Sequence, residues 1–378
     1  MPVTLRNAAL LAALLALMGC KKADNADKRT QSAEPPKAQQ RSAHAQTKTL
    51  RVGVLYWSMN ILGQVAMREG LELSLAPINA ARRAEHLREI ELVARVAGDG
   101  TAGIERQVAQ MRELLASDVD LIVVQPADTA ALSKVLQAAN KKGIPVVAYD
   151  QHVLQGELAS FITSDNYQAG YLNGEYVAAK FPDDKRLQIV VVEYPHVSST
   201  VSRVDGFADA LEATGQPFDF VKSYSAIEPV AGAIAGKAIL RDFPAPGSID
   251  VVFTVNDGGG LAVFNELEGA GRTEIFGATV DGAPASVAKI REGGIIRIDS
   301  AQFCGELGAT ALRTADALLR GRNVGRQLLV PVFPITAETE KQYKGWVGEV
   351  PASFTKPWAS EQPMWSPEIR PRGDGRAK

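Results

Sequence analysis

The sequence predicts an α/β fold of two doubly wound lobes, each with a parallel sheet covered by helices on both faces. From about Thr49 onward, short apolar runs alternate with amphipathic helical patterns, as is typical of parallel sheets buried on both faces. Strands in both halves end in polar residues at comparable places. The length of 378 residues suits about two domains.

The N-terminal residues are typical of an export signal. Arg6 precedes an apolar stretch, Ala8–Leu17, that is too short to cross a bilayer comfortably and suits a signal peptide. The stretch ends at Leu17–Cys20, which is similar to a bacterial lipobox, so we expect residues 1–20 to be a lipoprotein signal peptide with Cys20 as the lipid attachment site. The alternative is an ordinary cleaved signal in which Cys20 is incidental.

Composition limits the classes of partner and the redox chemistry. Residues 21–48 are polar and low in complexity, and we expect a flexible tether there. The net charge of −2 gives no basic surface for nucleic acid, so no nucleic-acid partner is expected. The cysteines are Cys20 and Cys304, and acylation of Cys20 would leave no intrachain disulfide. A domain of this size can fold without one.

Short runs rich in Val, Ile, Leu and aromatic residues predict the strands. They are Leu50–Tyr56, Leu92–Ala97, Leu121–Gln125, Pro145–Asp150, Phe161–Ser164, Gln188–Tyr194, Asp250–Asn256, Glu274–Asp281 and Ile295–Gln302.

Helical patterns lie between these runs. One apolar face is formed by Ile104, Val108, Met111 and Leu115. A second helix is expected over Ala130–Ala139, because Gly143 and then Pro145 end the pattern.

Polar residues stand where several predicted strands end. Gln125 and Asp150 do so in the first half, and Asn256 and Asp281 do so in the second. Ligands of open parallel sheets bind at the carboxyl ends of the strands, so these positions are candidates for a binding site.

The order of these motifs resembles the type I periplasmic binding proteins, specifically the ribose/galactose-binding branch of sugar-binding proteins. The resemblance covers about Thr49–Thr336. It rests on Gly53, Asn60, Asp120–Ile122, Gln125–Pro126, Lys142–Asp150, Ser164–Asn166, Gly170, Ser202–Arg203, Gly206–Phe207, Phe253–Asp257, Asp281–Gly282 and Gln302.

The resemblance implies two lobes joined by a hinge of three crossovers, which close over one ligand. The crossovers would fall near Thr163–Asp165, Gln302 and Val330. The N-terminal lobe would be residues 49–163 plus 303–329, and the C-terminal lobe residues 164–302 plus 330–345. Residues 346–378 would form an irregular C-terminal tail, rich in Pro.

The resemblance also implies the ligand-binding residues: Asn60, Asp150, Gln151, Arg203, Asn256, Asp281 and Gln302. Carboxylates accept hydrogen bonds from sugar hydroxyls, Arg offers a rigid fork of donors, and amides both donate and accept. Other roles remain open for some of them. Asp150 and Asn256 could cap a turn or helix, Arg203 could pair with Asp205, and Asp281 could be only a turn residue.

The sequence departs from the family where aromatic residues usually stack on the sugar. Ile61–Gln64 stands at one such place, and Gln151 stands where relatives often carry Arg. Trp57 and Tyr224 are candidates for ring stacking, although Trp57 could equally pack in the core. Gly258–Gly260 suits either a closely packed helix start or amides that approach an anionic group of the ligand.

Other classes of function fit less well. No pair among His44, His86, His152 and His196 has metal-ligand spacing, and no Gly-x-Ser-x-Gly motif occurs, so neither an enzyme nor a metal or cofactor is expected. Cys304 suits a packing residue better than a nucleophile. The sequence of residues 1–48 is not typical of the helix-turn-helix segment of a repressor.

Two partners remain possible for a binding protein of this kind in the periplasm or cell envelope. The ligand, a monosaccharide or related polyol, could be delivered to the permease of an ABC importer. Alternatively, the closed form could be presented to a membrane sensor kinase or chemoreceptor. The missing aromatic residues and the tail, with Trp346, Trp358 and Trp365, make the sensory alternative credible.

Overall fold

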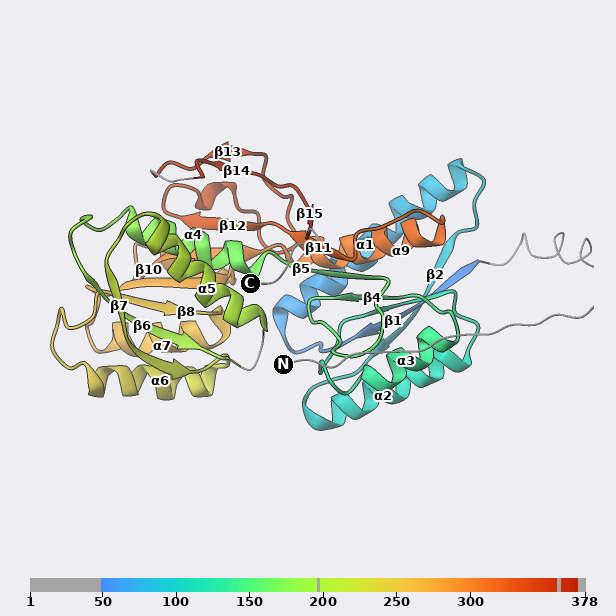
Figure 1. The fold of residues 1–378 in the computed structure, drawn as a ribbon, viewed down its shortest axis with the longest axis horizontal. Coiled ribbons are helices and arrows are strands. Elements are labelled where there is room, and N and C mark those ends of the chain that lie inside the picture. Colours follow the sequence, from blue (N-terminus) through green and yellow to red (C-terminus); the bar gives the residue numbers. More distant parts are fainter. Residues whose placement is uncertain (1–48, 196–197, 359–361, 373–378) are drawn as a thin grey trace, which may run out of the picture. The chain divides into compact units, whose positions relative to one another are not determined.

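The structure, a computed structural model, describes residues 49–195, 198–358 and 362–372 (Figure 1). The predicted signal peptide, tether and lipid attachment at Cys20 lie outside the described residues. Two main sheets organise the described part, with strand orders β15-β11-β5-β4-β3-β1-β2 and β12-β10-β9-β8-β6-β7. We call them sheet A and sheet B. No helix within the described ranges is both long enough and apolar enough to cross a membrane.

Sheet A is parallel except at one edge, where β15 runs antiparallel to β11. Its strands are β1 (Leu50–Tyr56), β2 (Ile90–Val96), β3 (Leu121–Val124), β4 (Val146–Tyr149), β5 (Ser160–Ser164), β11 (Gln327–Val330) and β15 (Arg370–Pro371).

Helices cover both faces of sheet A because alternate residues of its strands are apolar on each side. Leu55 and Ile122 pack with residues of α2 (Gly100–Ala116) and α3 (Ser133–Lys141). Val54 and Val123 belong to a second cluster that includes residues of α1 (Leu62–Ala84) and α9 (Cys304–Leu319).

The helices α1 and α9 pack against each other through glycines. A Cβ atom at Gly308 would lie 1.9 Å from the carbonyl oxygen of Met67, and one at Gly70 would lie 1.9 Å from that of Gly305. The backbones therefore approach more closely than any other residue would permit. This contact joins the beginning of the lobe to a helix that the chain forms about 240 residues later.

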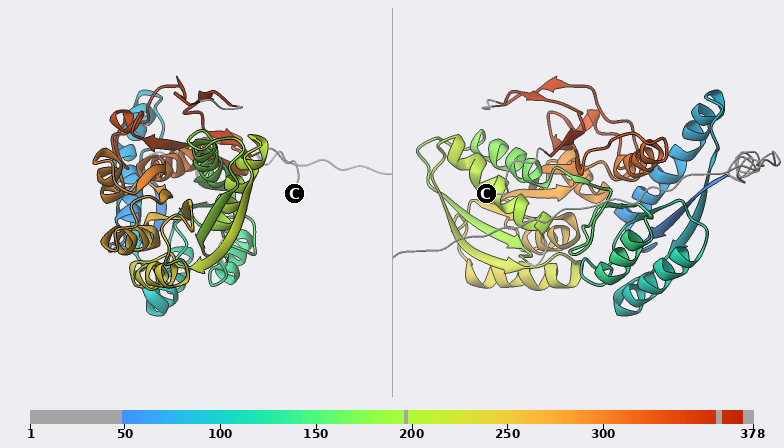
Figure 2. Two further views of the ribbon diagram at one scale, coloured as in Figure 1. Left: turned by 90° about the vertical axis from the view of Figure 1, so that its left-hand side faces the viewer. Right: turned by 45° about the vertical axis from the view of Figure 1, so that its right-hand side comes forward.

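Sheet B is parallel except for β12, which runs antiparallel to β10. Its strands are β6 (Leu187–Glu193), β7 (Phe218–Ser225), β8 (Val251–Thr254), β9 (Phe276–Asp281), β10 (Ile296–Gln302) and β12 (Val332–Thr336). The helices α4 (Asn166–Ala178) and α5 (Ser198–Ala213) pack side by side, as do α6 (Pro229–Asp242) and α7 (Asp257–Gly269). Figure 2 shows the two pairs on opposite faces of sheet B, and α8 (Pro284–Arg291) precedes β10.

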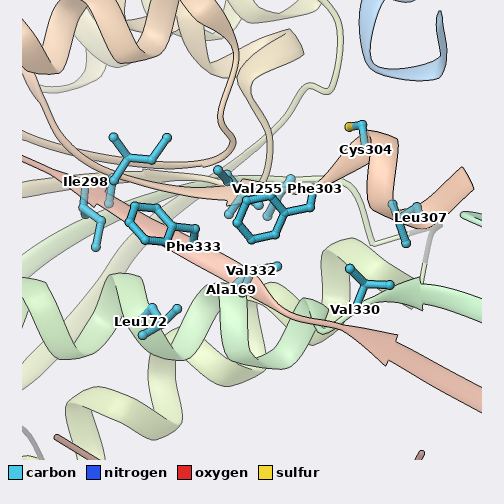
Figure 3. Packing of buried hydrophobic residues seen from close by; sticks show 14 of the residues in the cluster. Ala169, Leu172, Val255, Ile298, Phe303, Cys304, Leu307, Val330, Val332 and Phe333 are labelled. Carbon is cyan, nitrogen blue, oxygen red and sulfur yellow. The ribbon is translucent and has the colours of Figure 1, made fainter. Parts of the chain in front are cut away.

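The chain passes between the two sheets after β5, after β10 and between β11 and β12, and the C-terminal segment returns from β12 of sheet B to β15 of sheet A. Hydrogen bonds join the crossing segments. The Ser164 hydroxyl donates to Gln302 Oε1 at 2.7 Å, and the Asp165 amide donates to the Val330 carbonyl at 2.8 Å. Figure 3 shows Phe303 and Phe333 among the buried apolar side chains beside Val330 and Val332.

The segment after the short 3₁₀ helix η1 (Glu340–Gln342) is mostly irregular but well packed. It includes β13 (Phe354–Thr355), paired with β14 (Met364–Trp365), and β15 in sheet A. Lys356 and Glu175 form a buried ion pair, and the Trp358 indole donates to Glu175 Oε2 at 3.1 Å. The Trp365 indole donates to the Val332 carbonyl at 2.7 Å.

The predicted α/β class with two parallel-sheet lobes is confirmed, and each predicted strand is present with its ends shifted by a few residues at most. The pattern did not predict β7, β11 or β12. Most side chains of β7 are exposed or half-buried because it is an edge strand, so it lacks the continuous apolar run of its neighbours.

Candidate functional site

Two carboxylates occupy strained backbone positions at the ends of parallel strands. Asp150 follows β4 with φ of 66°, and Asp281 ends β9 with φ of 132°. Residues other than glycine rarely adopt positive φ, and such strain clusters at functional sites. Both aspartates, which were candidates because they stand at the carboxyl ends of parallel strands, therefore have a strained backbone.

Arg203 connects the polar side chains around Asp281. It lies on α5, is 5% exposed, and donates to Asn166 Oδ1 at 3.0 Å, to the Val255 carbonyl at 2.6 Å and to Asp281 Oδ1 at 3.2 Å. A guanidinium has five N–H donors in a planar fork, so these contacts fix its plane and leave donors for a ligand. The alternative pairing with Asp205 is not the arrangement seen.

Gln302 links Asp281 to the crossing segments. Its Nε2 donates to Asp281 Oδ1 at 2.7 Å, while its Oε1 accepts from the Ser164 hydroxyl at 2.7 Å. The amide thus has one contact with a candidate ligand-binding carboxylate and one with the segment that follows β5. A movement of the backbone at this crossover would therefore shift the Asp281 carboxylate through its hydrogen bond with Gln302.

Burial raises the pKa of Asp150 to about 6. A hydrogen bond from Gln125 Nε2 to Asp150 Oδ2, at 3.2 Å, and the positive charge of Arg203 act in the opposite direction, while the charge of Asp281 adds to the rise. Asp150 from the end of sheet A therefore interacts electrostatically with Arg203 and Asp281 of the other lobe. Burial also raises the pKa of Asp281, with Arg203 and Gln302 opposing it.

Asn256 and Asn60 have partners within the protein. Asn256 caps α7: its Oδ1 accepts from the Gly259 amide at 3.2 Å, and its Nδ2 donates to the Ile227 carbonyl at 2.9 Å. Asn60 is exposed after β1 and donates to Asp99 Oδ2 at 2.5 Å. Each amide retains one hydrogen-bonding position on nitrogen, so neither is excluded as a ligand contact.

The remaining predicted residues lie in different surroundings. Gln151 directly follows Asp150 and is half-buried. Trp57, also half-buried, follows β1, where its backbone amide and carbonyl contact Gln125 and Gly98. Tyr224 is not joined to the polar cluster in the part of the chain that the structure describes.

Tyr224 instead belongs to the edge of sheet B. Its hydroxyl donates to Asp242 Oδ2 at 2.8 Å, and the Lys222 ammonium lies 5.3 Å from the centre of its ring. These contacts engage Tyr224 at the edge of sheet B, and its role in ring stacking stays a prediction.

Gly258–Gly260 and Cys304 have packing roles. A Cβ atom at Gly260 would lie 2.3 Å from the Thr254 hydroxyl, so the glycines allow a closely packed start of α7. Cys304 is 2% exposed, and burial raises the pKa of its thiol, which removes the thiolate that a nucleophile needs.

Several polar contacts involve residues outside the implied ligand-binding set, although the strand-end pattern had marked Gln125 as a candidate. Gln125 contacts Asp150, and Asn166 contacts Arg203. Asn256 caps α7, one of the roles left open for it, and the next residue, Asp257, accepts from the Ala283 amide at 2.7 Å. Asp299, in the interior of β10, accepts from the Gly282 amide at 2.9 Å. The signal in the sequence was one acidic residue within a strand that is otherwise mostly buried.

Within the described ranges, no group of His, Cys, Asp and Glu side chains has an arrangement that could hold a metal ion. The arrangement is a set of carboxylates and amides at strand ends, joined by the guanidinium of Arg203 on α5, beside the segments that cross between the sheets. That combination defines a protein that binds a small polar ligand at the meeting point of two α/β lobes.

Comparison with known proteins identifies the family. The family model described as periplasmic binding protein domain matches residues 78–323, and the chain belongs to this family. The resemblance to the ribose-binding branch is confirmed, and this is a family of binding proteins and not of enzymes.

Curated relatives include two ribose import binding proteins. That of Escherichia coli (strain K12) is 26% identical over 58% of this chain and 72% of its own length. That of Bacillus subtilis (strain 168) is 25% identical over 82% of this chain and 94% of its own length. A xylitol-binding protein of Mycolicibacterium smegmatis is 26% identical over 78% of this chain and 79% of its own length.

Solved structures share the fold. A solute-binding protein of Actinobacillus succinogenes with bound D-allose has a TM-score of 0.65 and 22% identity, over 78% of this chain and 100% of that one. The Caulobacter myo-inositol binding protein has a TM-score of 0.64 and 20% identity, over 79% of this chain and 97% of that one. About a fifth of this chain therefore has no counterpart in these structures.

Proposed function

We propose that this protein is an exported solute-binding lipoprotein that captures a monosaccharide or related polyol and delivers it to an ABC importer. The observation that carries the proposal is the cluster of Asp150, Asp281 and Gln302 at strand ends with Arg203 of α5, beside the segments that cross between the sheets. Relatives with this fold are ribose, allose and xylitol binding proteins.

The chemistry of the cluster suits vicinal hydroxyls. Each sugar hydroxyl donates one hydrogen bond and accepts others, so it needs carboxylate acceptors and guanidinium or amide donors in fixed directions. Asp150 and Asp281 supply acceptors, while Arg203 and Gln302 supply donors already oriented by other contacts. We include Asn60, Gln151 and Asn256 as further contacts and Trp57 as the candidate ring face.

Binding by hinge closure follows from where these side chains originate. Asp150 follows a strand of sheet A, whereas Arg203 and Asp281 belong to elements around sheet B. We propose lobes of residues 49–163 plus 303–329 and 164–302 plus 330–345. A ligand that contacts both would favour the closed arrangement by its differential affinity for that state.

We further propose export to the periplasm with a lipid anchor on Cys20. The apolar stretch Ala8–Leu17 and the motif Leu17–Cys20 support this proposal. A tether over residues 21–48 would leave the lobes free to move at a membrane surface.

A thermal-shift screen tests the binding proposal. The panel contains D-ribose, D-allose, D-xylose, L-arabinose, xylitol, allitol and myo-inositol. A ligand selective for the native state raises the melting temperature, by an amount that increases with its concentration over Kd. The Arg203→Ala variant should lose the shift, whereas Lys237→Ala, at an exposed ion pair, should keep it. If no member shifts the wild type, the sugar assignment is wrong.

One observation supports the alternative that the protein is a sensory receptor. The tail adds a packed surface beside α4, which a membrane sensor could recognise. Deletion of the gene distinguishes the two roles. Loss of uptake of the radiolabelled panel sugar indicates transport, while intact uptake with loss of the transcriptional response to that sugar indicates sensing.

A further inference from the structure

Two buried carboxyl groups hold the turn that follows Asp281. Asp257 is 2% exposed and begins α7, and Asp299 is fully buried in β10. The Gly282 amide donates to Asp299 Oδ1 at 2.9 Å, and the Ala283 amide donates to Asp257 Oδ2 at 2.7 Å. Consecutive backbone amides after Asp281 are therefore tied to two different carboxyl groups.

The remaining carboxyl oxygens differ in their surroundings. The Thr279 hydroxyl donates to Asp257 Oδ1 at 2.9 Å and itself accepts from the Thr254 hydroxyl at 2.8 Å. Asp299 Oδ2 is buried, and no donor from the described residues lies within hydrogen-bonding distance of it; the buried Ser286 hydroxyl of α8 likewise has no partner there. An ionised carboxylate cannot donate, so two ionised groups would leave this oxygen unpaired beside a second negative charge.

One proton on the pair would give the unpaired oxygen a donor and would remove the second negative charge. A proton on Asp257 can be donated to Asp299 Oδ2, while the other contacts of both groups are kept. We propose that Asp257 and Asp299 share one proton as a carboxyl–carboxylate pair, which fixes the turn at Gly282 and Ala283 and makes both aspartates positioning residues for Asp281.

The electrostatics agree with this geometry. Burial raises the pKa of Asp257 well above its ordinary value, and the charges of Asp299 and Asp281 raise it further. Burial raises the pKa of Asp299 to about 6, while the neighbouring side chains of Asp257 and Ser286 of α8 lower it. Above about pH 6 the pair therefore holds one proton between the two groups.

Other charged and titratable groups face the pair from neighbouring elements. Asp281 of β9 forms an ion pair with Arg203 of α5, and Tyr343 donates to the Gly282 carbonyl at 3.3 Å. Burial keeps the pKa of the Tyr343 hydroxyl above its ordinary value, so this group stays neutral. Asp281 adds negative charge, which favours retention of the shared proton.

The pair explains how the backbone at Asp281 is maintained. Asp281 has φ of 132°, and Gly282 has φ of 77°. Hydrogen bonds from two backbone amides to the carboxyl pair hold this turn in its strained conformation. The Asp281 carboxylate therefore stays between Arg203 and Gln302. The positioning role of the two aspartates rests on the proposed function, in which Asp281 contacts the ligand.

Infrared spectroscopy of the ligand-free protein at pH 8 tests for the proton. The carbonyl-stretch band of a protonated carboxylic acid should be present in the wild type and absent in both Asp257→Asn and Asp299→Asn, because each leaves one ionised aspartate beside an amide. The control Asp219→Asn, at an exposed ion pair, should keep the band. A wild type without the band, or an Asp299→Asn variant that keeps it, overturns the proposal.

Amide hydrogen exchange and D-allose titration test the positioning. Asp299→Ala should exchange the Gly282 amide at least about tenfold faster than the wild type, and Asp299→Asn, which retains an acceptor, should restore slow exchange. Calorimetry with D-allose should show binding at least about tenfold weaker in Asp299→Ala and largely recovered in Asp299→Asn.

These outcomes separate the two proposals. If the acid band and the exchange pattern are as expected but D-allose and the other panel sugars do not bind, the paired carboxyls stand and the sugar assignment fails. If D-allose binds the wild type but Asp299→Ala binds equally well, the positioning role is refuted while the proposed function stands.

Discussion

Ligand affinity should depend on pH through Asp150. Its pKa of about 6 in the ligand-free protein means that the carboxyl is about half protonated at pH 6. Hydroxyls that donate to the carboxylate favour the ionised form, so binding lowers this pKa and releases a proton. Affinity is therefore complete above pH 7 and is lost as the pH falls through 6.

The magnitude follows from linkage. With a ligand-free pKa of about 6, the dissociation constant should be about twofold higher at pH 6 and about elevenfold higher at pH 5 than at pH 8. The last factor corresponds to about 1.4 kcal/mol. Calorimetry at pH 5, in buffers with different ionisation enthalpies, should detect about 0.9 proton released per ligand bound.

Asp150→Asn provides the matched control. The amide keeps the size of the carboxyl but does not titrate, so this variant should bind more weakly at pH 8 and lose most of the change between pH 8 and pH 5. Equal affinity of the wild type at pH 5 and pH 8 would refute the reasoning. So would an Asp150→Asn variant with the same pH dependence, since the titrating group would then lie elsewhere.

Four further outcomes are expected. Arg203→Lys should weaken sugar binding by about 1.5–3 kcal/mol in calorimetry, because an ammonium cannot reproduce the planar contacts of the guanidinium. Gly308→Ala should lower the free energy of unfolding by about 1–3 kcal/mol in urea titration, since the new Cβ would collide with the backbone of α1. Lys356→Met should destabilise the fold by about 3–5 kcal/mol in the same assay, because Glu175 would be left buried without its cation; an equally stable variant would contradict this. Cys20→Ser should move the protein from the membrane fraction to a soluble or misprocessed pool, and an unchanged membrane fraction would rule out the lipid anchor.

The sequence predicts the strands of this fold well where burial is two-sided. β1 has the predicted bounds because its residues are almost all buried and apolar. β7 was missed because one face of an edge strand meets solvent. β12 was missed because it follows β11 after a single residue, Pro331; the resemblance implied a crossover near Val330, but the residue pattern did not separate two strands there.

The site was partly predictable. The rule for parallel sheets locates Asp150 and Asp281, because it depends on strand ends that the sequence reveals. The partners Gln125, Asn166 and Asp299 depend on which elements pack together, which a single sequence does not specify. Tyr224 illustrates the same limit: it lies close in sequence to the expected stacking position, but its ring is engaged at the edge of sheet B.

The ion pair between Glu175 and Lys356 constrains how this protein can evolve. Both side chains are essentially inaccessible to water, and they join α4 to the C-terminal tail. A deletion that removed the tail in one step would expose a lineage to the full cost of an isolated buried carboxylate. Replacement of Glu175 by a neutral residue would have to come first. With both residues in place the tail is tied to α4, so among related proteins we expect the tail and an acidic residue at position 175 to occur together.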